Sequence, residues 1–170
     1  MNSLANAVAK KLYLFRMEKA CEIARRKGAI FNEAVATAMG ALESNWGTSQ
    51  LSQKANNLFG IKAGSSWTGE TIELPTWEWY PSKGWVRTTA KWRKYLSWNL
   101  CLVDYANLIA NRPWFRDALQ HLNDPEKFLE SLLPTPTEWG WATDPKYKDK
   151  VIDIALEIQR LGGPAWEKLP

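Results

Sequence analysis

The chain has 170 residues, of which 45% are hydrophobic and 24% charged. This composition is typical of a soluble globular domain that buries a core, and it excludes a disordered or fibrous protein. The net charge of +4 is spread along the sequence without a dense Lys/Arg block. It therefore argues against a nucleic-acid-binding protein and favours approach to an anionic surface. No stretch approaches the ~20 apolar residues of a membrane span.

The first clear pattern is a helix over residues 15–27, with Met17 and Cys21 on its apolar face. Gly28 supplies its stop, because glycine readily adopts the left-handed conformation that ends many helices. Residues 1–14 are expected to form either a short helix or a loose arm. They do not resemble a signal peptide, since basic residues interrupt the apolar character and no cleavage site follows.

A second helix is predicted to lead up to Glu43. Asn32 is its N-cap and Gly47 its stop. Apolar residues recur at helical spacing at Val35, Ala38, Met39 and Leu42. Glu43 falls in the last turn, and Gly40, one turn back, is too small to fill the space around its carboxyl group. The negative end of the helix dipole and apolar neighbours both disfavour ionisation, so Glu43 should hold its proton near neutral pH.

A glutamic acid that holds its proton can protonate the oxygen of a glycosidic bond as that bond breaks. The alternative is an ordinary solvated glutamate near a helix end, which the helix pattern by itself favours. The choice between these interpretations depends on the residues around Glu43.

Residues 49–66 are predicted to be loop with one short helix. In this segment the Asn57 amide can either hydrogen-bond the nearby backbone or contact a ligand. Phe59 is either a core residue or the wall of a binding subsite. Both alternatives are open at this stage.

Residues 67–92 are rich in Thr, Ile, Val and Trp between turn residues, which predicts a β-hairpin or three-stranded lobe. Glu70, Glu73 and Glu78 lie on this lobe. Glu78, between two tryptophans, could present a second carboxylate across a cleft from Glu43. The alternative for Glu78 is a solvated strand glutamate.

The rest of the chain is predicted to be helical. One helix follows Ser97, Pro113 opens another, Asp124 caps a third, and Asp144 begins the last, which Gly162 stops. We therefore expect a single domain, mainly α (α+β), with a small β-lobe.

Cys21 and Cys101 are expected to be buried free thiols, although one disulfide between their helices stays possible. His121 is the single histidine, so a histidine metal site or a Ser/His/Asp triad would have to be built around this one residue, and neither is expected. We also expect no cofactor. Eleven tryptophans are more than packing ordinarily needs, which indicates that some form platforms for sugar rings.

Several motifs resemble the bacterial glucosaminidases of glycoside hydrolase family 73, over roughly residues 15–161. They are, in the family's order, Ala41–Ser49 (ALESNWGTS), Lys54–Lys62 (KANNLFGIK), Trp67–Gly69, Pro75–Glu78, Trp92–Tyr95 and Ala142–Pro145. The resemblance implies a lysozyme-like helical domain with a β-hairpin lobe beside the cleft.

The resemblance also implies site residues. Glu43 is the proton donor and Glu78 the second carboxylate, while Glu73 stays a rival because family hairpins vary in length. Asn57 and Phe59 shape the floor near Glu43. The candidate sugar platforms are Trp46, Phe59, Trp67, Tyr95 and Trp141.

Trp141 departs from the family, whose members usually carry a tyrosine there that is implicated in catalysis or substrate positioning. An indole keeps the aromatic surface but can only donate a hydrogen bond. Tyr147 and Tyr95 are the tyrosines that could compensate.

The sequence thus predicts a peptidoglycan hydrolase, an endo-β-N-acetylglucosaminidase acting as a monomer on glycan strands. The alternatives are a lytic transglycosylase or muramidase on the same fold, and a non-catalytic cell-wall-binding module. In the absence of a recognised signal peptide, we expect synthesis in the cytoplasm and either release as a phage lysin or export by a non-Sec route.

Overall fold

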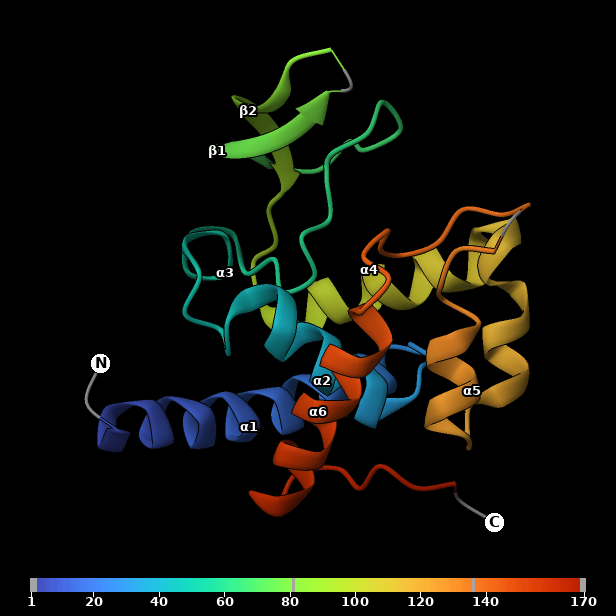
Figure 1. Ribbon diagram of the computed structural model, residues 1–170. Coiled ribbons are helices and arrows are strands. Elements are labelled where there is room, and N and C mark those ends of the chain that lie inside the picture. Colours follow the sequence, from blue (N-terminus) through green and yellow to red (C-terminus); the bar gives the residue numbers. More distant parts are fainter. Residues whose placement is uncertain (1–2, 81, 136, 169–170) are drawn as a thin grey trace.

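The computed structural model describes residues 3–80, 82–135 and 137–168, without the side chains of residues 3, 77–80 and 85. Its helices form a body from which a β-hairpin lobe stands away on a narrow neck (Figure 1). The mainly helical fold with a small β-lobe is therefore confirmed. No helix in the described part of the chain combines the length and apolar character needed to cross a membrane.

The elements follow one another along the chain with short connections. In order they are α1 (Ser3–Arg26), α2 (Glu33–Ser44), α3 (Gln50–Ala55), β1 (Thr71–Tyr80), β2 (Gly84–Arg93), α4 (Trp98–Asn111), the 3-10 helix η1 (Pro113–His121), α5 (Pro125–Glu130) and α6 (Tyr147–Arg160).

The described part of the N-terminal segment is helical, so the helix is the correct alternative for residues 3–14. It is continuous with the next predicted helix, and α1 runs without a break from Ser3 to Arg26. Tyr13 and Met17 from this helix are fully buried. Gly28, with a φ of +86°, follows the helix end as predicted.

The core surrounds α2, which packs against α6, α1 and α5, while α1 also packs on α4. Asn32 caps α2 as predicted, since its side chain accepts a hydrogen bond from the Val35 N–H at 3.0 Å. Cys21 and Cys101 are buried free thiols, which confirms that prediction. Burial raises the pKa of each thiol to about 12, so both stay protonated.

The last helix begins later than predicted. Asp144 lies before α6 rather than opening it, because its side chain accepts a hydrogen bond from the Lys146 N–H at 2.9 Å in a turn. The helix starts at Tyr147. Gly162, with a φ of +87°, follows its end as expected.

The lobe is an antiparallel hairpin in which β1 pairs with β2 from Thr71 opposite Arg93 to Tyr80 opposite Gly84. An isolated bridge between Lys62 and Trp92 ties the preceding loop to the base of β2. Of the two predicted forms of the lobe, a hairpin and a three-stranded sheet, the hairpin is correct. The Lys62–Trp92 bridge stands where a third strand would pair.

An ion pair at the neck fastens the hairpin to α4. Arg93 is 7% exposed, and its Nη1 donates to both carboxylate oxygens of Asp104 at 2.8 Å. The Tyr95 hydroxyl donates to the same carboxylate at 2.6 Å, and the Arg93 Nε donates to the Lys62 carbonyl at 3.3 Å. These contacts fix the lobe relative to the helical body.

Replacing Asp104 by Asn is expected to destabilise the protein. The substitution leaves the buried Arg93 charge without a counter-ion, which typically costs about 3 kcal/mol. Urea unfolding followed by circular dichroism measures the loss. Asp153→Asn is the matched control, because Asp153 is exposed on α6 and its loss should change the free energy of unfolding by less than ~0.5 kcal/mol. Equal stability of the two variants would contradict the role of the ion pair.

Candidate active site

The end of α2 presents Glu43 at the surface of the helical body. The helix ends at Ser44, and the three residues that follow have positive φ: Asn45 at 49°, Trp46 at 57° and Gly47 at 74°. The helix therefore stops before Gly47, the predicted position, because Asn45 already adopts the left-handed conformation.

The left-handed turn after α2 is held by specific contacts. The Ser44 hydroxyl donates to the Gly40 carbonyl and accepts from the Gly47 N–H at 2.8 Å. A Cβ on Gly47 would come within 2.8 Å of the Trp98 ring, so glycine is required for packing as well as for its φ. The turn holds the last residues of α2, and with them Glu43, in place.

A hydrogen bond from α6 reaches the Glu43 carboxyl group. Tyr147, the first residue of α6, is buried, and its hydroxyl donates to the Glu43 Oε1 at 2.9 Å. The two residues are 104 positions apart in the sequence. Because Oε1 accepts this bond, Oε2 is the oxygen left to carry a proton toward a ligand.

The surroundings of Glu43 favour its protonated form. Although the residue keeps an exposed side, the protein around its carboxyl group removes water, and this desolvation raises its pKa above the ordinary value of 4.5. The Tyr147 hydrogen bond works in the opposite direction and lowers the pKa, but its effect is the smaller one. The predicted proton-holding character of Glu43 therefore has a physical basis.

The glycine that lies beside the Glu43 carboxyl group is Gly60, whereas the sequence suggested Gly40. A Cβ on Gly40 would lie 2.7 Å from the Tyr13 hydroxyl, so packing of α1 fills that side. A Cβ on Gly60 would instead lie 3.9 Å from both the Glu43 Oε2 and the Trp92 ring. Gly60 also has a φ of +62°, which a side chain would strain.

Asn57 positions the loop that carries Gly60. Its side chain is 1% exposed, donates to the carbonyls of Ile61 and Arg93 at 2.9 and 2.8 Å, and accepts from the Ile61 N–H at 3.0 Å. The Asn57 amide is therefore used in hydrogen bonds to the backbone, which is the first of the two predicted roles. It shapes the floor near Glu43 indirectly.

The predicted aromatic platforms are spread over the molecule. Phe59 and Tyr95 are buried, the first stacked on Tyr105 at 4.4 Å and the second bonded to Asp104. Trp46 packs edge-on against Tyr13 of α1, with ring centroids 5.6 Å apart.

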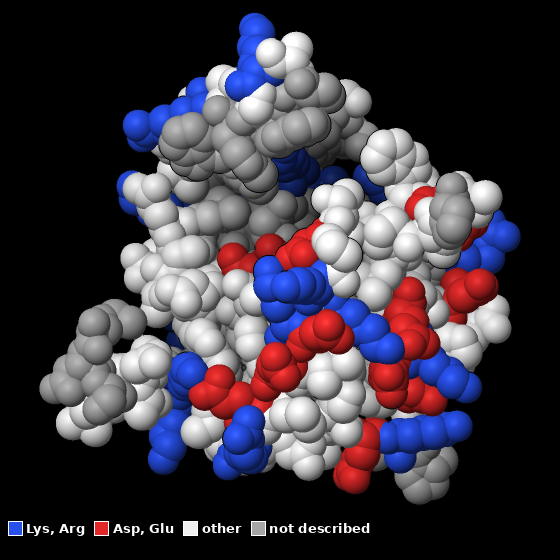
Figure 2. All heavy atoms as spheres, viewed as in Figure 1, with Lys and Arg blue, Asp and Glu red and all other residues white. Residues whose placement is uncertain are grey.

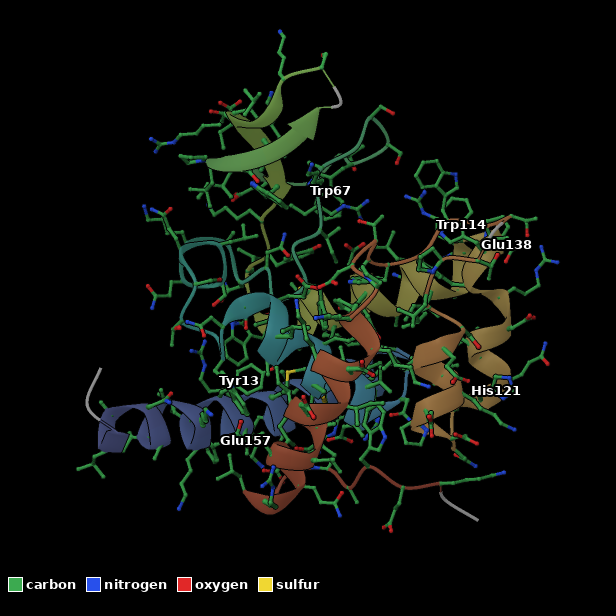
Figure 3. The ribbon with its side chains drawn as sticks, in the orientation of Figure 1. Tyr13, Trp67, Trp114, His121, Glu138 and Glu157 are labelled. Atoms are coloured by element: carbon green, nitrogen blue, oxygen red, sulfur yellow. The ribbon has the colours of Figure 1, made fainter. Side chains whose placement is uncertain are left out.

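Trp67 and Trp141 are half-buried. Trp67 lies at the base of the lobe, under the Arg93 guanidinium at 4.6 Å (Figure 3). The Trp141 ring packs against Tyr105 at 5.3 Å and Phe115 at 6.0 Å. A role in sugar binding for these rings stays a prediction.

The hairpin register separates the two candidates for a second carboxylate. Side chains alternate between strand faces, and Trp92 lies opposite Ile72. Position 78 therefore belongs to the face that includes Trp92, whereas Glu73 belongs to the other face, where its carboxylate is 3.5 Å from Lys91. The side chain of Glu78 lies outside the described residues.

A hollow separates the hairpin lobe from the helical body, with some acidic atoms at its floor (Figure 2). Next to Gly60 lies a cavity of about 240 Å³, whose lining includes the aromatic residues Trp114 and Trp141. Trp114 projects from the helical body on the side toward the lobe (Figure 3). Sequence reasoning did not identify Gly60, Trp92 or Trp114, and it named Tyr147 only as a possible substitute for a missing tyrosine.

Comparisons with known proteins place the chain in a family. The family model described as Glucosaminidase, mannosyl-glycoprotein endo-beta-N-acetylglucosaminidase, matches residues 18–160. Peptidoglycan hydrolase FlgJ of Pseudomonas aeruginosa is 36% identical over 126 residues, which are 72% of this chain and 30% of the relative. Exo-glucosaminidase LytG of Bacillus subtilis is 34% identical over 123 residues, which are 71% of this chain and 42% of the relative. The chain thus spans less than half the length of either relative.

Solved structures show the same fold. The catalytic domain of the autolysin Auto from Listeria monocytogenes superposes with a TM-score of 0.71 at 27% identity, covering 91% of this chain and 85% of that one. The glycoside hydrolase domain of Salmonella typhimurium FlgJ gives a TM-score of 0.67 at 26% identity, covering 90% of both chains. From its sequence motifs, its lysozyme-like fold and these matches, the chain belongs to the glucosaminidase family, glycoside hydrolase family 73.

Proposed function

We propose that this domain hydrolyses the β-1,4 glycosidic bonds of peptidoglycan glycan strands, as an N-acetylglucosaminidase with Glu43 as the proton donor. Its family membership supports a glycosidase, and the printed names of the relatives, a peptidoglycan hydrolase and an exo-glucosaminidase, support the substrate.

One observation carries the proposal. The Glu43 carboxyl group has one oxygen bonded to Tyr147, and its other oxygen lies beside Gly60, a residue without a side chain. Desolvation raises the pKa of this group, so a protonated fraction survives nearer to neutral pH than for an ordinary glutamate. An exposed residue whose carboxyl group holds its proton is suited to protonate the oxygen of a departing sugar.

In the reaction, the Glu43 Oε2–H gives its proton to the bridging oxygen while the bond from that oxygen to the anomeric carbon breaks. The sugar left with the broken bond acquires oxocarbenium character. Water then adds to its anomeric carbon and gives up a proton to a carboxylate, which is Glu78 where that residue takes part and the ionised Glu43 where it does not. Glu43 is then a carboxylate, and the Tyr147 hydroxyl stabilises it by donating to Oε1.

Glu78 is our candidate for the second carboxylate, supported by its register on the Trp92 face of the hairpin. Position 78 lies about 20 Å along the strand from the level of Trp92, at the rise of a β-strand. The Arg93–Asp104 ion pair holds the base of the hairpin, so participation of Glu78 would require the strands beyond that base to bend toward Glu43. Assistance by the acetamido group of the substrate would need no such movement.

The products of wall digestion test the proposed linkage. After borohydride reduction, mass spectrometry of the fragments should show newly formed reduced N-acetylglucosamine ends. Reduced N-acetylmuramic acid ends would indicate a muramidase, and anhydro-muramyl ends a lytic transglycosylase. Either of these results would overturn the N-acetylglucosaminidase assignment.

Replacing Glu43 by Gln is expected to abolish turnover while leaving strand binding intact. The amide keeps the shape of the side chain but has no acidic proton, and loss of general-acid catalysis typically costs 10²–10⁴-fold in rate. The release of reducing ends from purified sacculi measures the effect. Glu33→Gln at the start of the same helix is the matched control and should retain activity. A non-catalytic wall-binding module would instead leave wild type and Glu43→Gln equally inactive.

The same substitution should change stability in a pH-dependent way. The folded pKa of Glu43 is raised, so its contribution to stability is complete below the ordinary glutamate pKa and is lost as pH rises through the folded value. Gln cannot ionise and escapes that loss. The melting temperature of Glu43→Gln relative to wild type should therefore be higher at pH 7 than at pH 4. The reverse order would show that Glu43 is stabilised as a carboxylate.

Replacing Tyr147 by Phe should lower kcat by roughly 10- to 100-fold, the value of one hydrogen bond to a charged group. Activity requires protonated Glu43, so it falls as pH rises through the pKa of that group. Because the Tyr147 hydrogen bond lowers this pKa, its removal should shift the alkaline limb of the pH–rate profile to higher pH. Tyr95→Phe removes the other candidate hydroxyl and should leave the limb in place. A limb that moves only in Tyr95→Phe would contradict this assignment.

A further inference from the structure

The cavity beside Gly60 has several aromatic residues in its lining. They are Phe59, Trp114, Phe115 and Trp141, with Gly60 and Gly140 also among the lining residues. Gly60 is also the residue beside the Glu43 Oε2, so the cavity and the surroundings of the proposed acid share this residue. At about 240 Å³ the cavity is small enough to take a single ring.

A cation stands at the rim of the cavity. Arg112 is the charged residue among the lining residues that the structure describes, and the others are apolar, aromatic or glycine. Its guanidinium lies 5.3 Å from the centre of the Trp114 ring, a cation–π distance.

The backbone fixes Arg112 at this place. Its N–H donates to the Leu108 carbonyl at 3.1 Å and closes α4, and Pro113 then directs the chain into η1. The side chain is exposed. Among the described residues, no carboxylate lies within ion-pair distance of its guanidinium. Arg112 therefore presents a charge that the described protein leaves unbalanced, at the mouth of an aromatic cavity.

We propose that this cavity is a subsite for a sugar unit that carries a carboxylate, and that Arg112 binds the carboxylate. The inference rests on the proposed function and defines which strands the site accepts. In peptidoglycan the acidic unit is N-acetylmuramic acid, whose lactyl group bears a carboxyl or a carboxylate-containing stem peptide. The apolar face of its ring packs on the indoles, and the planar guanidinium pairs with the carboxylate in a two-pronged contact.

This assignment makes Arg112 a specificity residue that distinguishes peptidoglycan from chitin. Chitin strands have the same β-1,4 linkage and N-acetyl groups but carry no carboxylate. They can fill the aromatic cavity without engaging the guanidinium. Arg112 should therefore increase the affinity for peptidoglycan strands and leave the affinity for chitin oligosaccharides unchanged.

The test compares Arg112→Ala with wild type on soluble peptidoglycan glycan strands and on chitohexaose. Loss of one charge-assisted contact, about 1.5–3 kcal/mol, should lower kcat/KM on peptidoglycan strands roughly 10- to 100-fold, mainly through KM. The kcat/KM on chitohexaose should not change. Arg112→Lys should lose less than Arg112→Ala, because lysine keeps the positive charge but lacks the planar guanidinium that makes a two-pronged contact. Arg116→Ala, which removes an exposed arginine within η1, is the matched control and should match wild type on both substrates.

A binding measurement separates failure of this inference from failure of the proposed function. Calorimetry with Glu43→Gln and with the double variant Glu43→Gln/Arg112→Ala reports strand affinity without turnover. Weaker binding of peptidoglycan strands in the double variant supports the subsite even if no hydrolysis is detected. Equal affinity of the two proteins, or an equal loss on chitohexaose, would overturn it.

Discussion

The hydrogen bond from Tyr147 to Glu43 is the contact on which the site depends. It joins the last turn of α2 to the first residue of α6, so it exists only when the two helices are packed. It occupies one carboxyl oxygen and leaves the other facing the space at Gly60. Removal of water by the protein around the carboxyl group raises its pKa, and this effect exceeds the lowering by the Tyr147 hydrogen bond. The orientation of the Glu43 carboxyl group thus depends on one helix contact, and its protonation depends on the desolvation around it.

The elements around this contact are held independently of it. The left-handed turn after α2 is fixed by Ser44 and by the close approach of Trp98 to Gly47. The loop with Gly60 is fixed by the buried amide of Asn57. The hairpin is fixed to α4 by the Arg93–Asp104 ion pair. Substrate can therefore meet an acid whose geometry is set before binding, which avoids an ordering cost at the time of reaction.

Local sequence signals predicted much of this structure. The Asn32 cap and apolar stripe placed Glu43 in the last turn of its helix, and the Thr- and Trp-rich segment predicted the hairpin. Features that depend on the packing of distant segments could not be predicted from the sequence. Gly40 and Gly60 look alike in sequence, yet Gly40 packs against the Tyr13 hydroxyl and Gly60 lies beside the Glu43 carboxyl group. Tyr147 could not be chosen over Tyr95, because only the three-dimensional contacts show which hydroxyl reaches Glu43 and which reaches Asp104.

Titration of the Glu43 carboxyl group tests the central claim most directly. Carbon-13 NMR of protein labelled at its glutamate side-chain carboxyls, with the Glu43 resonance assigned by its absence in Glu43→Gln, follows ionisation of this group alone. The account predicts a pKa above the ordinary glutamate value of 4.5. A pKa at or below that value would show that Glu43 is a carboxylate at working pH, and it would contradict a general-acid role.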